Sequence, residues 1–165
     1  MNEQTILSLM NQTGHANYFG GVYPADMLPN KPLKKHGYIA NTEPYGSTGL
    51  HWVAFFFPVN GIPEYFDSYG LPPINYHFQK FLQAESIHFS NIHIQATSSM
   101  NCALFCMYYI CERWKGVAPS HVVSLFSEKN KYLNDIFIEK YINTAFNVEI
   151  DKYYDPDFLN MYNNK

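Results

Sequence analysis

The stretch QATSSMNCALFCMYYICERWKG, residues 95–116, decides how this chain can fold. From Cys102 to Trp114 it is apolar on nearly every face, which predicts a helix buried inside the molecule. Three N-cap candidates stand immediately before this helix: Ser98, Ser99 and Asn101. Gly116 ends the helix. A helix without a polar face has to be covered on all sides, so the other elements are expected to pack around it.

The remaining chain mixes strand-like and helix-like segments. Alternation of apolar and polar residues predicts strands at 38–41, 50–58, 63–67 and 90–95. Helical spacing predicts helices at 3–10, 74–84, 120–126 and 132–146. Residues 18–32 contain two glycines and three prolines and are expected to form turns and irregular extended backbone. The mixed order predicts the α+β class.

Length and composition indicate one compact domain. The chain has 165 residues, of which 47% are apolar and 18% are aromatic, enough for a sizeable core. We expect residues 1–165 to form a single domain, with 151–165 as a flexible Tyr/Asn-rich tail. A net charge of −3 gives no basic field, so broad nucleic-acid binding is not indicated and remains uncertain. No long uncharged apolar run or apolar leader is seen, so we expect neither a membrane-bound nor a secreted protein.

All three cysteines fall within ten positions of the predicted buried helix: Cys102, Cys106 and Cys111. Their number and spacing do not suggest a disulfide framework, and a reducing, intracellular setting fits them best. Cys106 and Cys111 lie deeper in the helix and are interpreted as buried apolar residues. A zinc site that also uses His88 and His93 is not favoured, because no Cys-x-x-Cys pair is present.

Cys102 differs from the other two cysteines because it begins the helix. Backbone N–H groups and the helix dipole at that end favour a reactive thiolate. Upstream stand three residues that suit thiol catalysis: His51 as the base, Asp67 as the group that orients the imidazole, and Gln95 as a donor to the oxyanion. Each has an ordinary structural explanation when taken alone. Their order and the seven-residue interval from Gln95 to Cys102 favour a cysteine protease.

Together these elements resemble the adenovirus-type cysteine proteases, the adenains, and more distantly the ubiquitin-like-protein proteases. The resemblance covers residues 1 to 125. Five segments carry it: YFGGVY (18–23), IANT (39–42), GLHWVAF (49–55), DSYG (67–70), and Gln95 with NCALFC (101–106). The blocks around His51 and Cys102 are the specific ones.

The resemblance implies a relative of papain in circularly rearranged order, with a central helix packed on a mostly antiparallel sheet. It places the family's catalytic residues on His51, Asp67, Gln95 and Cys102, with the Cys102 N–H as a second oxyanion donor. The implied function is a viral cysteine endopeptidase that cuts capsid or core precursor proteins at small, Gly-containing sites during virion maturation. Its partners would be viral structural precursors. It would act in the infected cell, including the nucleus, and in the virion. The alternatives are a ubiquitin-like-protein deconjugating protease and a catalytically inert binding or structural protein of this fold.

The chain also departs from the adenovirus pattern. Residues 82–85, where the family's activating peptide would form a disulfide, contain no cysteine. Covalent activation is therefore not expected, while a noncovalent activating peptide remains open. The acidic net charge makes a DNA cofactor doubtful, and the chemistry itself requires no cofactor. The acidic position holds Asp67 rather than glutamate, as in ubiquitin-like-protein proteases, and an aspartate can also orient an imidazole.

Overall fold

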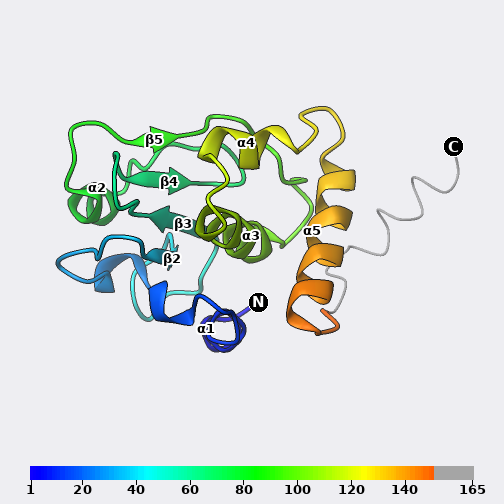
Figure 1. Cartoon of the computed structure of the whole chain (residues 1–165), viewed down its shortest axis with the longest axis horizontal. Helices are drawn as coiled ribbons and strands as arrows, with labels where there is room; N and C mark the ends of the chain where they lie inside the picture. The colour runs from blue at the N-terminus through cyan, green and yellow to red at the C-terminus, as the bar shows by residue number, and fades with distance from the viewer. Residues whose placement is uncertain (151–165) are drawn as a thin grey trace, which may run out of the picture.

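The computed structural model describes residues 1–150 and shows a five-stranded mixed sheet packed against helices (Figure 1). The strands lie in chain order across the sheet: β1 (Phe19–Tyr23), β2 (Gly37–Asn41), β3 (Trp52–Phe56), β4 (Glu64–Phe66) and β5 (His88–Phe89). The predicted α+β class is therefore confirmed. The expected tail at 151–165 lies outside the described residues.

The sheet is not mostly antiparallel, which corrects the expectation. β3 pairs antiparallel with β2 and β4, whereas the edge pairs β1·β2 and β4·β5 are parallel. Parallel neighbours need a crossover between them. Residues 24–36 carry the chain back between β1 and β2, and α2 (Tyr76–Leu82) lies in the crossover between β4 and β5.

All five predicted helices are present, with ends that differ by a few residues at most. Besides α2 they are α1 (Glu3–Met10), α3 (Cys102–Trp114), α4 (Pro119–Ser124) and α5 (Lys131–Phe146). Two short 3₁₀ turns, Ala16–Tyr18 and Ala25–Met27, flank β1. Every residue of α3 from Cys102 to Cys111 is buried, as an all-apolar helix requires.

Within residues 1–150, the strand predicted at 90–95 is absent, and two strands form that were not predicted, β1 and β5. The chain at 90–95 is not a strand, because the backbone N–H groups of Ile94 and Gln95 both donate to the Ser68 carbonyl instead of joining a ladder. Conversely, β1 forms where turns were expected. Gly20 allows the Tyr38 ring to pack against the β1 backbone, since a Cβ at this position would lie 2.0 Å from that ring.

The two faces of the sheet build two cores. Alternate side chains of β3 point to opposite faces. Ala54 and Phe56 pack in the cluster that contains α3, whereas Val53 and Phe55 pack in the cluster that contains α2. The beginning of β3 is thereby held between a helix on each side, which fixes the backbone next to His51.

Candidate active site

His51 and Asp67 meet at one end of the central strand pair. His51 directly precedes β3 and Asp67 directly follows β4, and the antiparallel pairing of these strands brings the two residues together. His51 Nε2 lies 2.9 Å from Asp67 Oδ1, and the Asp67 carboxylate is almost fully buried. Asp67 Oδ1 also accepts the Tyr69 backbone N–H at 2.7 Å, which fixes the carboxylate toward the imidazole.

Cys102 approaches the same imidazole from the α3 side. It is the first residue of α3, a helix that packs against β3, and it is among the groups that raise the pKa of the His51 ring. Because Nε2 faces Asp67, Nδ1 is the ring nitrogen left for the thiol. The structure thus brings the predicted base, its orienting carboxylate and the predicted nucleophile into one row.

The environment of His51 favours its protonated form. Burial lowers the pKa of His51, but the hydrogen bonds from Asp67 and Cys102 and their negative charges together raise this pKa to about 9. An imidazolium at neutral pH stabilises a neighbouring thiolate. The site therefore places a cationic imidazole beside Cys102.

The N-terminus of α3 is left open by its own N-cap residue. Asn101 occupies the N-cap position but makes no side-chain capping bond; its amide instead donates to Asp135 and Glu139 of α5, at 3.0 Å each. The Leu104 N–H donates to the Asn101 carbonyl at 2.9 Å, whereas no side chain caps the N–H groups of Cys102 and Ala103. They remain available to an anion beside Cys102, either the thiolate or an oxyanion.

Gln95 is fully buried, and the orientation of its amide is fixed. Nε2 donates to the Ser99 carbonyl at 2.9 Å and to the Tyr69 hydroxyl at 3.3 Å, while Oε1 accepts from the Ser68 hydroxyl at 2.6 Å. A carbonyl can only accept, so the Ser99 contact requires the amide nitrogen on that side. Gln95 accordingly presents a donor on the side of Tyr69, whose ring stacks on His51.

Tyr69 contacts His51, Asp67 and Gln95, and the sequence predicted no role for it in the site. Its ring stacks on His51 with centroids 4.9 Å apart, its hydroxyl accepts from Gln95, and its N–H donates to Asp67. Burial raises the pKa of Tyr69, and negative charge at Cys102, Asp135 and Asp67 raises it further, so the hydroxyl stays neutral. The only sequence signal was the aromatic position in the quoted segment DSYG.

Cys106 and Cys111 are buried free thiols, as predicted. Burial raises the pKa of Cys106 well above its ordinary value, and negative charge at Cys102 and Asp67 adds to this effect. Burial also raises the pKa of Cys111 to about 12, against a smaller lowering effect of Lys115. Both remain protonated at neutral pH, so neither competes with Cys102 as a nucleophile.

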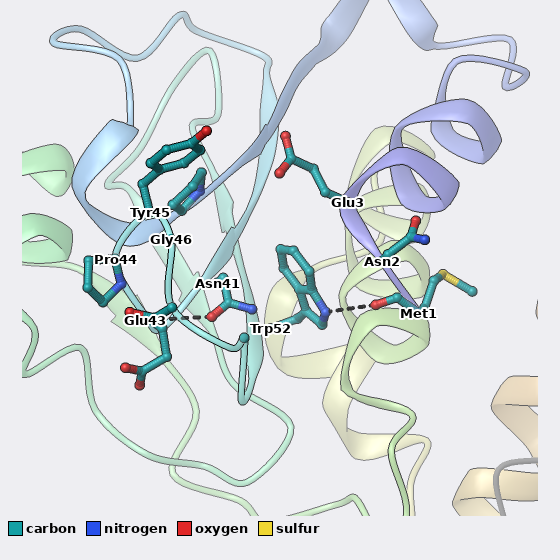
Figure 2. A pocket seen from close by; sticks show the side chains of 12 residues that line it. Met1, Asn2, Glu3, Asn41, Glu43, Pro44, Tyr45, Gly46 and Trp52 are labelled. Carbon is teal, nitrogen blue, oxygen red and sulfur yellow. Dashed lines mark hydrogen bonds between the residues drawn. The ribbon is translucent and has the colours of Figure 1, made fainter.

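One cavity borders this row of residues, and a second lies at the neighbouring Trp52. An apolar cavity of about 600 Å³ is bordered by His51, Asp67 and Tyr69, and reaches Ile74 and Phe78 of the α2 region. The second cavity, of about 360 Å³, lies beside Trp52, the residue after His51. In Figure 2, Met1 and Glu3 line one side and Tyr45 the other, and the Trp52 indole donates to the Met1 carbonyl at 3.3 Å. The apolar cavity thus provides ligand-sized space beside the imidazole, whereas the Trp52 cavity does not border His51.

Within residues 1–150, no group of three or more His, Cys, Asp or Glu side chains is arranged to hold a metal ion. No helix in this part of the chain has the length and apolar character needed to cross a bilayer.

Comparison with known proteins adds one structural relationship. Neither the family models nor the curated protein sequences give a match to this chain. Among solved structures, the crystal structure of the ASFV pS273R protease matches with a TM-score of 0.50 and 25% sequence identity. The match covers 71% of this chain but only 46% of that chain, so our chain spans less than half the length of that protease. The predicted resemblance is confirmed at this level: the chain has the fold of the adenain-like and SUMO-protease-like cysteine proteases.

Proposed function

We propose that the chain is a viral cysteine endopeptidase that cuts structural precursor proteins after small, Gly-containing sequences during virion maturation. The observation that carries this proposal is the row formed by Asp67, His51 and Cys102, with the thiol at the N-terminus of α3. The similarity to the ASFV pS273R protease supports a viral cysteine protease. The substrate and the role in maturation are inferred from the family resemblance.

In the proposed reaction, Cys102 transfers its proton to His51 and the thiolate attacks the carbonyl carbon of the scissile peptide. The C–S bond forms as the carbonyl π-electrons move to oxygen. The oxyanion is held by the Cys102 N–H and the Gln95 amide. His51 then protonates the leaving amine, and water, deprotonated by His51, releases the acyl group from Cys102.

The hydrogen bonds of Gln95 indicate how it would serve the oxyanion. Its contact with the Ser99 carbonyl is 2.9 Å, whereas its contact with the Tyr69 hydroxyl is 3.3 Å. The longer bond is the weaker one. We propose that substrate replaces this contact while the bonds to Ser99 and Ser68 keep the amide in place.

The apolar cavity beside His51, Asp67 and Tyr69 supports a peptide as the substrate. We propose that a side chain of the bound peptide occupies this cavity. We propose viral structural precursors as partners, with action in the infected cell, including the nucleus, and in the virion. No DNA cofactor is proposed, and a noncovalent activating peptide can be tested by adding candidate viral peptides to the assay.

The test is cleavage of a fluorogenic peptide with Gly-Gly before the cut, compared with the same peptide carrying valine at both positions. We expect cleavage of the first only, and loss of that activity in Cys102→Ala but not in the matched control Cys111→Ala. A ubiquitin-like fluorogenic conjugate distinguishes deconjugation: if it alone is cut, the endopeptidase proposal is wrong. No cleavage of any substrate would favour the inert alternative.

A further inference from the structure

Helix α5 holds the chain segment that leads into the nucleophile. We name residues 95–101, from Gln95 to the N-cap of α3, the oxyanion segment. It has no regular secondary structure apart from turns. Three of its residues donate hydrogen bonds to α5: Ala96, Ser99 and Asn101. Gln95 is held in turn by the Ser99 carbonyl. Figure 1 shows α5 beside α3, at the end of the sheet. A loop without regular structure needs such external contacts to keep a fixed geometry.

Asp135 is the centre of these contacts. Its Oδ2 accepts the Ala96 backbone N–H at 2.8 Å, and its Oδ1 accepts the Ser99 hydroxyl and the Asn101 amide, the latter at 3.0 Å. Asp135 has no exposed surface, and both donor side chains are buried. Three donors therefore converge on one buried carboxylate, which can only accept while it is ionised.

The neighbours of Asp135 extend this arrangement. Asn134 donates to the Ile94 carbonyl at 2.8 Å, just before the oxyanion segment, and Glu139 accepts from Asn101 at 3.0 Å. Three α5 residues at the spacing i, i+1 and i+5 thus hold both ends of the segment. Burying these polar groups is costly unless all are satisfied, so the arrangement has one well-defined geometry.

Two of the three contacts of Asp135 bear on the proposed oxyanion donors. Fixing Ser99 places the carbonyl that holds Gln95 Nε2. Fixing the Asn101 side chain places the residue whose peptide bond to Cys102 carries the backbone donor. One carboxylate therefore controls both the amide and the backbone donor.

We propose that Asp135 is a positioning residue that sets the geometry of the oxyanion hole from α5. This inference rests on the proposed function, since it assigns a role in the same reaction. Asp135 itself contacts neither substrate nor Cys102 in this account. It acts through Ser99 and Asn101, and the contribution lies in orienting donors before the transition state forms.

Asp135→Asn in the full chain is the direct test. The new amide places an N–H₂ group against at least one of the donors, so the oxyanion segment has to shift. Misplacement of about 1 Å can cost roughly 10²-fold in rate. We therefore expect kcat to fall by about 10- to 100-fold while KM stays within about twofold. The matched control Glu128→Gln removes an exposed carboxylate just before α5 and should leave both constants unchanged.

The folded fraction of each variant, taken from its urea denaturation curve, separates positioning from unfolding. Ser99→Ala removes a single donor and should lower kcat less; it is decisive if Asp135→Asn does not fold. Wild-type kcat per folded molecule in either folded variant would overturn the proposal.

Hydrogen exchange gives a readout that does not depend on peptidase activity. In Asp135→Asn, the amides of the oxyanion segment, Ala96 above all, should exchange faster, while amides inside α3 keep their protection. Unchanged exchange of Ala96 would contradict the proposed contact. If the wild-type chain cleaves no peptide, the proposed function fails, yet faster exchange would still show that Asp135 holds this segment.

Discussion

Gln95 and His51 show how the chemistry depends on the partners of single side chains. The amide of Gln95 is fixed by Ser68 and Ser99, and the imidazole of His51 by Asp67 and the stacked Tyr69 ring. Neither group has to reorganise when charge develops, which is the condition for strong electrostatic stabilisation. Two predictions at this scale follow from the bonds that hold them.

Replacing Gln95 by alanine removes one of two proposed oxyanion donors. Loss of one such donor typically costs about 10²–10³ in kcat, so we expect residual activity rather than none. Gln79→Ala, which changes an exposed glutamine on α2, is the matched control. Steady-state kinetics measures kcat of both variants. A fully active Gln95→Ala enzyme would show that Gln95 is not part of the active site.

Asp67→Asn should change the pH profile as well as the rate. Burial lowers the pKa of His51, but Asp67 and Cys102 raise it to about 9, so the imidazolium is lost as pH rises through that value. We expect the alkaline limb of kcat/KM near pH 9 in the wild-type enzyme. Without the Asp67 charge, the limb should move to lower pH. An alkaline limb that stays in place in the variant would show that Asp67 does not control the charge of His51.

Among the elements, α3 and β4 are joined at the end remote from Cys102. Arg113 makes two 2.7 Å contacts with the buried Glu64 carboxylate, which also accepts the Tyr109 hydroxyl at 2.8 Å. β4 ends directly before Asp67, so this buried ion pair fixes the helix that carries the nucleophile against the strand that leads to the acid.

Arg113→Ala would leave the Glu64 charge buried without its cation. Breaking a buried pair in this way typically costs about 3–5 kcal/mol of unfolding free energy. The control is Lys115→Ala in the half-exposed pair with Glu112, where the loss should be about 0–1 kcal/mol. Urea denaturation of both variants measures the difference, and equal losses would contradict the structural role assigned to Arg113.

Elements whose signal is local could be predicted from the sequence, and those that depend on distant partners could not. The apolar content of α3 is visible in one stretch, and all five helices were found in this way. β1 was missed because Gly20 reads as a turn residue, although it makes room for Tyr38 of another strand. Residues 90–95 alternate like a strand, but the backbone N–H groups of Ile94 and Gln95 donate to the Ser68 carbonyl.

For the whole molecule, the site is assembled from segments far apart in the chain. His51, Asp67, Gln95 and Cys102 could be named from residue order and family resemblance, and the fold brings the first, second and fourth together. Tyr69 and Asp135 could not be found, because their contacts arise only when the 67–70 turn and α5 pack around α3. Alternation in the sequence also could not give the direction of the edge strands, which depends on the path of the crossovers.

The central claim is that this fold activates Cys102 through His51. Alkylation of the three cysteines by iodoacetamide at neutral pH, followed by mass spectrometry, tests it directly. Cys102 and Cys111 are almost equally exposed, at 7% and 9%, so accessibility alone predicts similar rates. The account predicts that Cys102 reacts far faster than Cys106 and Cys111, and that His51→Ala abolishes this preference. Labelling of Cys102 no faster than Cys111, or unchanged by His51→Ala, would contradict it.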